Sequence, residues 1–351
     1  MRIGIVAPPW APVPPVLYGG IEVIVDQLAT GFQEHGHEVL LFTTGDSTCA
    51  VPRRHHLDRA EGARMGHSGP EIRHVLAAYD AMDEWGADIV HDHTLAGPVH
   101  AAATPATTTT PPVVTTMHNQ FDHEAADIYR RIAGRVPIIA ISHAQRRPVP
   151  DLPIARVIHH GLRATDFPVG TGHPQNDDEP DYCLFLGRMS PDKGPHRAME
   201  AAYKAGMRLI MCAKMRDPWE FDYFDEYVRP YLNDDIQYLG EVPHERKLEL
   251  LAGARALLFP IRWNEPFGMV ALEAMACGTP VLAFPEGAIP EIVEHGKTGF
   301  LCDDIADLSE AIGRIDRIDR HDCRAAVEGY YSTDRMVREH VELFETLTRN
   351  R

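Results

Sequence analysis

The sequence predicts an α/β protein made of doubly wound parallel sheets. Short apolar stretches alternate with longer amphipathic stretches along nearly all of its 351 residues, which is typical of buried parallel strands covered by helices. Residues 166–181 interrupt this alternation with Pro, Gly and an acidic run, a composition typical of a linker. The length is sufficient for two domains with substantial cores, so we expect one domain on each side of the linker.

The first domain is expected over residues 1–165. Residues 3–7 predict a buried parallel strand, and a Pro-rich loop that ends in Gly19 and Gly20 leads to a helix over 21–34. The loop lacks G-x-G-x-x-G, so the fingerprint of nicotinamide or flavin binding is absent. The two glycines instead offer bare amides that a phosphate can approach, although a plain turn explains them equally well.

The remaining elements continue the same alternation in both halves. Further strands are expected over 39–43, 87–91, 113–117, 137–142, 156–160, 182–186, 209–212, 236–239, 256–259 and 281–284. Further helices are expected over 70–86, 122–134, from 195, over 218–231, 245–252, 304–317, 322–330 and 336–347. Residues 101–112, rich in Ala, Thr and Pro, predict a loose connection.

Composition excludes several classes of partner. The formal charge of −17 argues against a nucleic acid partner and disfavours broad docking on anionic lipid, although a local patch could still contact a membrane peripherally. The six cysteines are scattered without a CxxC pair, so neither a zinc knuckle nor a disulfide framework is indicated. No signal peptide and no apolar run of membrane-spanning length is found. These observations predict a cytoplasmic protein.

Histidines follow two of the expected strands of the first half. His91, Asp92 and His93 could suggest a metal site, but alternation along a strand sends neighbouring side chains to opposite faces, so structural or rim roles are favoured and no metal is expected. His118 follows the strand at 113–117, where it could contact an anomeric centre or orient an acceptor hydroxyl. The alternative is a histidine at the edge of the core.

Two glutamates mark residues 264–280. The run predicts a loop followed by a short helix, with Pro266 in its first turn and Gly278 just past its end. Glu265 and Glu273 would then lie about 12 Å apart at helical rise. Carboxylates match the hydroxyls of a sugar well, so each could bind one end of an elongated polyol.

The amides at the start of the same helix form the second feature of this run. Phe267, Gly268 and Met269 would expose backbone N–H groups at a helix N-terminus, which favours an anion. A helix with one buried face and two solvated glutamates is the alternative.

Two cations follow the first strand of the second half. Residues 187–194 read G-R-M-S-P-D-K-G, between an apolar strand and a helix that starts at Pro195. Arg188 and Lys193 could neutralise charge on a departing nucleoside diphosphate without a divalent metal. An ordinary basic turn is the alternative.

These motifs together, E-P-F-G-x-x-x-x-E-A-M-A-x-G-T-P-V and G-R-x-x-x-x-K-G, resemble those of the retaining glycosyltransferases of family 4, with their E-x7-E motif. The resemblance covers nearly the whole chain and is strongest over 182–301. It implies the GT-B fold, in which two Rossmann-like domains with doubly wound parallel sheets face a central cleft. The acceptor-side domain would be 1–165, the linker 166–181 and the donor-binding domain 182–332, with the helix at 333–351 packing back on the first domain.

The resemblance also implies a role for each matching residue. Glu265 would bind donor-sugar hydroxyls, Glu273 the ribose, and Arg188 and Lys193 the diphosphate. The implied catalytic residues are Arg188, Lys193, Glu265 and His118. The implied donor-binding residues are Gly19, Gly20, Arg188, Lys193, Glu265, Phe267, Gly268, Met269 and Glu273. The chain departs from the family at His160, where an Asn is usual, and this leaves any contact from that turn in doubt.

The activity implied is retaining transfer of a hexosyl group from a nucleotide-sugar, UDP-glucose-like or GDP-mannose-like, to an unidentified acceptor such as a small molecule, lipid or glycan. No residue is an obvious nucleophile beneath the sugar, so same-face substitution is favoured over double displacement. Domain closure would exclude water. We expect no cofactor and no metal.

Alternative functions on a similar architecture are a nucleotide-sugar epimerase, a periplasmic type of sugar-binding protein and, more distantly, a glycan phosphorylase. The epimerase is the main alternative, but it would need acid and base groups for proton transfer at C2. The combination of two cations with E-x7-E does not supply that pattern.

Overall fold

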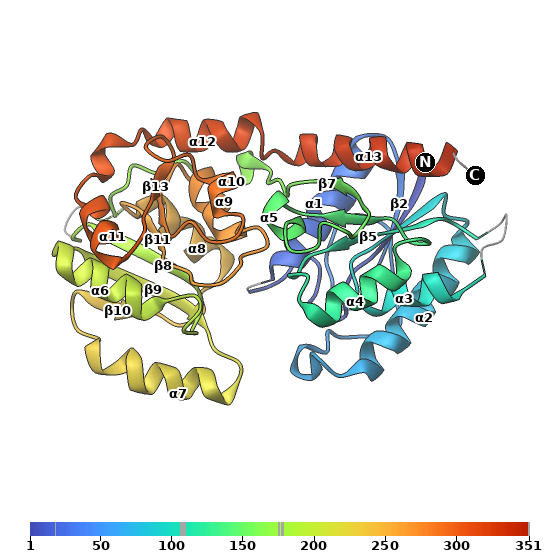
Figure 1. The fold of residues 1–351 in the computed structure, drawn as a ribbon, viewed down its shortest axis with the longest axis horizontal. Coiled ribbons are helices and arrows are strands. Elements are labelled where there is room, and N and C mark those ends of the chain that lie inside the picture. Colours follow the sequence, from blue (N-terminus) through green and yellow to red (C-terminus); the bar gives the residue numbers. More distant parts are fainter. Residues whose placement is uncertain (18, 106–109, 175, 177–178, 350–351) are drawn as a thin grey trace. The chain divides into compact units, whose positions relative to one another are not determined.

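The computed structural model describes residues 1–17, 19–105, 110–174, 176 and 179–349 (Figure 1). Residue 18 of the expected first loop, residues 106–109 of the expected connection, 175, 177 and 178 of the expected linker, and 350–351 of the expected C-terminal segment 333–351 lie outside the described residues. The chain separates into two compact units. Unit 1 comprises residues 1–161 and 333–351, and unit 2 comprises residues 162–332.

Unit 1 is built on a parallel sheet that has seven strands among the described residues, in the order β3-β2-β1-β4-β5-β6-β7. Its strands are β1 (Arg2–Val6), β2 (Glu38–Thr43), β3 (Arg53–His55), β4 (Ile89–Asp92), β5 (Val113–Met117), β6 (Ile138–Ala140) and β7 (Ile154–Val157). Ile3 of β1 pairs in register with Val39 of β2 on one side and Ile89 of β4 on the other. The strand order reverses between β1 and β4, and ligands of open α/β sheets bind outside the carboxyl ends of strands at such a point.

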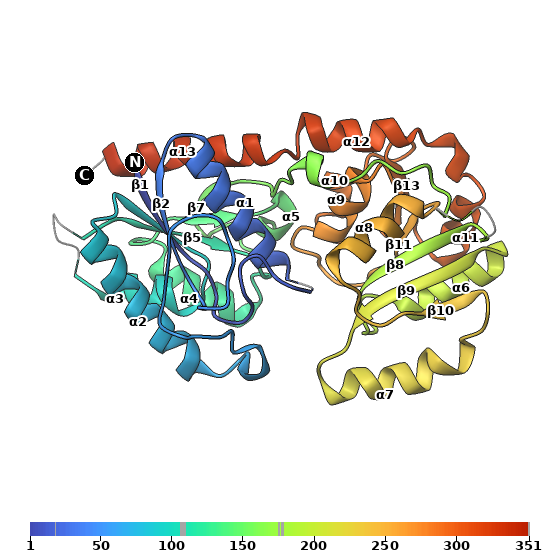
Figure 2. The same ribbon diagram turned by 180° about the vertical axis from the view of Figure 1, so that it is seen from behind.

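Helices surround this sheet. They are α1 (Gly20–Glu34), α2 (Ser68–Trp85), α3 (Ala96–Ala103), α4 (His123–Ile132), α5 (His143–Arg146) and α13 (Thr333–Arg349). Unit 1 also has a short 3-10 turn at Gly62–Arg64, and unit 2 has such turns at Ala164–Asp166, Arg229–Tyr231 and Ile315–Arg317. The last helix, α13, packs against α1 in unit 1 (Figures 1 and 2). There the ring of His35 bonds to the carboxylate of Asp334 at 2.9 Å.

Unit 2 repeats the plan with a parallel sheet that has six strands among the described residues, in the order β10-β9-β8-β11-β12-β13. Its strands are β8 (Tyr182–Arg188), β9 (Arg208–Lys214), β10 (Ile236–Tyr238), β11 (Leu257–Phe259), β12 (Val281–Ala283) and β13 (Gly299–Leu301). Its helices are α6 (Pro195–Ala205), α7 (Pro218–Tyr227), α8 (His244–Gly253), α9 (Met269–Ala276), α10 (Ile289–Ile292), α11 (Ile305–Ile312) and α12 (Arg320–Gly329). The strand order reverses between β8 and β11.

The described part of residues 166–181 lies along unit 2. The amide of Gly170 donates to the carbonyl of Cys277 at 3.0 Å, and Arg320 donates to the carbonyls of Gly170, Ala252 and Ala254 at 2.9–3.0 Å. The amide of Leu162 also donates within unit 2, to the carbonyl of Tyr331 at 2.8 Å. The boundary of unit 2 therefore falls at residue 162, before the stretch in which the sequence places a linker.

Helix α3 is a difference from the sequence-based expectation. The sequence predicts a loose connection from residue 101, whereas α3 runs to Ala103. Thr94 stabilises the first turn, because its hydroxyl accepts from the amide of Gly97 at 2.9 Å. The Ala-rich part of the segment thus follows its helix propensity.

Candidate active site

The two cations of residues 187–194 lie where β8 ends and α6 begins. Arg188 is the last residue of β8 and pairs with Lys214 of β9, so the strand extends two residues beyond the predicted end. Gly194 caps α6, and Pro195 is its first residue. The predicted arrangement of strand, turn and helix is confirmed, and it presents Arg188 and Lys193 at the carboxyl end of the strand.

Arg188 is held by the first turn of α7. Its guanidinium donates to Glu220 at 2.6–2.9 Å and to Asp217 at 3.2 Å. The Glu220 side chain is fully buried and also accepts from the amides of Arg216 and Asp217 at 2.6 and 3.0 Å. Burial alone would raise the pKa of Glu220, but these amides and Arg188 outweigh burial and lower it. An ionised Glu220 therefore fixes Arg188, whose side chain is still 43% exposed.

Lys193 contacts the loop that follows β11. Its ammonium lies 2.6 Å from Oε2 of Glu265, and the indole N–H of Trp263 donates to the same oxygen at 2.6 Å. The ammonium also lies 4.3 Å from the centre of the Trp263 ring. The side chains of Lys193 and Glu265 are only 12% and 13% exposed, so the pair is shielded from water.

The loop that carries Glu265 is longer than predicted. Helix α9 begins at Met269, and Gly268 is its N-cap with a φ of 107°. The expectation that Pro266 lies in the first helical turn is therefore wrong, and the separation of about 12 Å for a continuous helix does not apply. The left-handed backbone at Gly268 ends the loop and delays the helix. The predicted end is confirmed, because Gly278 follows the C-cap Cys277 with a φ of 73°.

Glu273 lies within α9 and is paired with a residue that the sequence analysis missed. Its Oε1 accepts from Lys247 of α8 at 2.7 Å, and the two side chains are 9% and 22% exposed. The sequence around Lys247 does not indicate this pairing, because Glu273 lies 26 residues further along the chain. The sequence predicts only a helix over 245–252 in this region.

A third loop, between β12 and α10, holds the backbone of Glu265. The carbonyl of Glu265 accepts from the amide of Ala288 at 2.9 Å. Gly287, with a φ of 58°, approaches so closely that a Cβ there would lie 2.3 Å from the Glu265 nitrogen and oxygen. Arg262 joins the loops further, because its amide donates to the carbonyl of Asp192 at 2.7 Å and its guanidinium to Glu286 at 2.9 Å. Loops after β8, β11 and β12 therefore hold one another in place.

The glycines and amides singled out by sequence lie at helix starts. Gly19 is the N-cap of α1 in unit 1, and a Cβ at Gly20 would meet nothing within 4 Å. In unit 2, no described residue accepts a hydrogen bond from the amides of Gly268 and Met269. Phe267, just before them, is buried.

His118 belongs to a cluster of five histidines in unit 1. Its Nε2 bonds to Nδ1 of His93 at 2.8 Å, and its ring stacks on that of His160 at 5.3 Å. His91 lies 4.1 Å from His93 and 5.0 Å from His340, between ring centres. Burial, with a contribution from His340, lowers the pKa of His118 to about 3, and burial lowers the pKa of the other four rings too. The cluster is therefore neutral near pH 7.

The alternation expected along residues 91–93 is confirmed. The rings of His91 and His93 lie together, whereas the carboxylate of Asp92 accepts from Tyr79 at 2.9 Å and from Thr94 at 2.7 Å. Burial raises the pKa of Asp92 to about 7. Across the part of the chain that the structure describes, no group of three or more His, Cys, Asp or Glu side chains has a geometry that could hold a metal ion.

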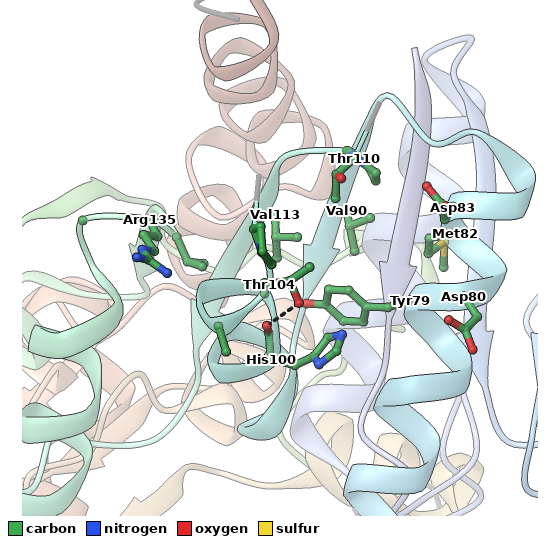
Figure 3. A pocket seen from close by; sticks show the side chains of 16 residues that line it. Tyr79, Asp80, Met82, Asp83, Val90, His100, Thr104, Thr110, Val113 and Arg135 are labelled. Carbon is green, nitrogen blue, oxygen red and sulfur yellow. Dashed lines mark hydrogen bonds between the residues drawn. The ribbon is translucent and has the colours of Figure 1, made fainter. Parts of the chain in front are cut away.

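A cavity of about 740 Å³ lies elsewhere in unit 1 (Figure 3). Tyr79 and Met82 of α2 line it together with Val90 of β4 and Val113 of β5, and its edge includes Thr104, whose hydroxyl donates to the carbonyl of His100 at 2.9 Å. These residues lie near the amino ends of β4 and β5, whereas the sequence-predicted residues lie at carboxyl ends. The cavity is thus separate from the candidate site.

Within the described ranges, no helix is long and apolar enough to cross a membrane.

Two family models match the chain, one in each half. Residues 18–165 match the model described as Glycosyltransferase Family 4. Residues 172–326 match the model described as Glycosyl transferases group 1.

Curated relatives match along most of the chain. A glycogen synthase of Mycobacterium tuberculosis (strain ATCC 25618 / H37Rv) is 25% identical over 352 residues, covering 86% of this chain and 83% of the relative. A D-inositol 3-phosphate glycosyltransferase of Acidothermus cellulolyticus is 27% identical, covering 85% of this chain and 78% of the relative.

Solved structures agree over the full length. AviGT4, a glycosyltransferase involved in avilamycin A biosynthesis, is 25% identical with a TM-score of 0.72, covering 100% of this chain and 98% of that one. Anabaena Alr3699/HepE, solved in complex with UDP and glucose, is 20% identical with a TM-score of 0.76, covering 98% and 99%. The catalytic domain of starch synthase IV from Arabidopsis thaliana, bound to ADP and acarbose, is 14% identical with a TM-score of 0.77, covering 100% and 99%. The last two likenesses concern the fold alone.

Proposed function

Since the chain belongs to the GT-B glycosyltransferases, we propose that it is a retaining enzyme of family 4 that moves a hexosyl group from a nucleotide-sugar to a hydroxyl acceptor. One observation carries the proposal. Two cations, Arg188 and Lys193, and the carboxylate of Glu265 are presented by the loops after β8 and β11, where the strand order of unit 2 reverses.

The donor is proposed to bind on unit 2. Arg188 and Lys193 would grip its diphosphate, and the amides of Gly268 and Met269 offer further donors for an anion. Glu265 would accept from hydroxyls of the sugar, and Glu273 from the ribose, with Lys247 orienting that carboxylate. The ligands bound in the structures of two fold neighbours, UDP with glucose and ADP with acarbose, agree with a nucleotide-sugar donor. We propose a UDP-glucose-like or GDP-mannose-like donor.

The proposed reaction replaces one bond at the anomeric carbon by another on the same face. The bond from this carbon to the leaving diphosphate breaks, and the acceptor oxygen bonds to the carbon. The acceptor proton passes to an oxygen of the leaving diphosphate. Arg188 and Lys193 would stabilise the negative charge that accumulates on this group, so a divalent metal would not be required.

Unit 1 is proposed to supply neutral hydrogen-bonding groups. His118, which is uncharged at neutral pH, would bond to the sugar or orient the acceptor hydroxyl without adding a charge. Gly20 has no described atom within 4 Å of its Cβ position, and its amide would contact the diphosphate. All six cysteines are free and buried, which supports a reducing, cytoplasmic location.

Thermal-shift measurements against UDP-, GDP-, ADP- and TDP-sugars test the donor proposal without knowledge of the acceptor. A selective donor stabilises the folded protein by mass action, so it raises the melting temperature more than the other sugars do. Lys193→Ala should remove this selective shift. If no nucleotide-sugar raised the melting temperature of the wild type, the proposed function would be wrong.

A further inference from the structure

Two side chains of unit 2 donate hydrogen bonds to a single carboxylate oxygen. Oε2 of Glu265 accepts from the Lys193 ammonium and from the Trp263 indole, each at 2.6 Å. The other oxygen, Oε1, accepts no hydrogen bond from any residue that the structure describes. The carboxylate is thus oriented with one oxygen occupied and one left to accept from a ligand.

The two donors differ in how firmly they hold this orientation. Lys193 lies 72 residues away from Glu265 in the chain and reaches it with a flexible stem. Trp263 precedes Glu265 by two residues, and the amide of Glu265 donates to the carbonyl of Trp263 at 2.8 Å in a tight turn. The indole has few rotatable bonds and lies in the same turn as Glu265, so its N–H is less free to move than the Lys193 ammonium.

This difference matters because Lys193 has two tasks in the proposed function, on which this inference rests. Without donor, Lys193 neutralises Glu265. When it contacts the diphosphate, its ammonium must turn at least partly away from Glu265. The carboxylate would then be free to rotate unless a second group held Oε2.

We propose that Trp263 is a positioning residue for the donor sugar. Its indole N–H keeps Oε2 of Glu265 in place while Lys193 engages the diphosphate, so that Oε1 faces a hydroxyl of the hexose. Its ring face meanwhile holds the ammonium of Lys193 near the site before donor binds.

Trp263→Phe separates the two contributions, since phenylalanine keeps a ring for the cation and loses the N–H. We expect kcat for transfer to fall by about 10- to 100-fold, the effect of one charge-assisted hydrogen bond. Calorimetry should show affinity for a nucleotide without sugar (UDP, GDP or ADP) within about twofold of the wild type, because the sugar contact is absent there. Affinity for UDP-glucose, GDP-mannose or ADP-glucose should fall, so the preference for nucleotide-sugar over free nucleotide shrinks.

Trp85→Phe is the matched control. Trp85 also carries a cation over its ring, the guanidinium of Arg2 at 4.8 Å, and it lies at the end of α2 in unit 1, outside the proposed machinery. This variant should keep both the turnover and the preference for nucleotide-sugar. A loss of both nucleotide and nucleotide-sugar affinity in Trp263→Phe would indicate a merely structural role and overturn the inference.

Glu265→Ala distinguishes failure of this inference from failure of the proposed function. If Glu265→Ala is impaired in transfer while Trp263→Phe keeps wild-type turnover and preference, the positioning role is wrong and the proposed function stands. If Glu265→Ala itself transfers sugar at the wild-type rate, the proposed sugar site is wrong, and the role of Trp263 fails with it.

Discussion

The loops of unit 2 after β8 and β11 and the histidines of unit 1 after β4 and β5 both lie at the carboxyl ends of parallel strands, yet their electrostatics are opposite. In unit 2 the side chains are charged, and each has a counter-charge, as in Lys193 with Glu265 and Glu273 with Lys247. In unit 1 burial keeps the imidazoles neutral, and His118 bonds to another histidine.

Under the proposed function, the two kinds of group would have different tasks. A group that leaves as a diphosphate needs fixed cations. A neutral hydroxyl acceptor and a neutral sugar need hydrogen bonds without added charge. Substituting the charged residues of unit 2 should therefore lower the rate of sugar transfer. Protonating the histidines of unit 1 should instead lower the free energy of unfolding.

The largest effect is expected for Lys193→Ala. Removing this cation takes away stabilisation of the leaving diphosphate, so kcat/KM for sugar transfer should fall by roughly 10³-fold or more. The measurement is initial-rate kinetics with the donor that thermal shift selects. Lys204→Ala is the matched control, because Lys204 forms an exposed pair with Glu200 one helical turn away, and its loss should leave the rate unchanged. Wild-type turnover in Lys193→Ala would refute the role of this cation.

A second large effect concerns pH and the neutral histidines. The folded-state pKa of His118 is about 3 and that of His340 about 4, both below the usual 6.5, so the unfolded chain binds more protons on acidification. The contribution of these histidines to the free energy of unfolding is thus largest above about pH 6.5 and falls as the pH drops from there toward 4. Asp92 contributes with the opposite sign, because its raised pKa favours the folded state as the pH falls below about 7. Each such histidine contributes a slope of up to about 1.4 kcal/mol per pH unit.

Urea denaturation at pH 7.5, 6.5 and 5.5 measures this slope. His340→Leu should reduce it by up to one proton, whereas the same change at the exposed His321 should not. An unfolding free energy independent of pH across this range would contradict the neutral state of the cluster.

A moderate effect is expected for Lys247→Met. The variant keeps much of the side-chain length but removes the partner of Glu273, so the carboxylate loses its orientation. KM for the donor should rise by about 10-fold with a smaller change in kcat, since ribose binding contributes equally to ground and transition states. An unchanged KM would argue against a ribose contact at Glu273.

The smallest expected effect is that of metal removal. Because Arg188 and Lys193 are proposed to neutralise the leaving group, transfer should proceed at the same rate in excess EDTA. Activity lost in EDTA and restored by Mg²⁺ or Mn²⁺ would shift the neutralising role from the side chains to an ion.

Much of this architecture follows from local pattern. The apolar side chains of residues 3–6 are buried in β1, as the sequence predicts. Gly278 lies just past the end of α9, also as predicted. The start of α9 could not be read in this way. Pro266 is favourable in a first helical turn, but Gly268 adopts a left-handed backbone, and a Cβ there would lie 2.8 Å from the side chain of Ile289 in α10.

The two rounds of strand and helix, the motif residues and their place at strand ends can be predicted from the sequence, because they depend on periodicity and turn chemistry within short segments. Which charges meet depends instead on how the strands and helices pack. Lys193 reaches Glu265 because β8 and β11 are neighbours in the sheet, Lys247 reaches Glu273 because α8 packs on α9, and Trp263 aims its N–H at an oxygen that Lys193 shares. Such pairings depend on strand order and helix packing, which no local stretch of sequence encodes.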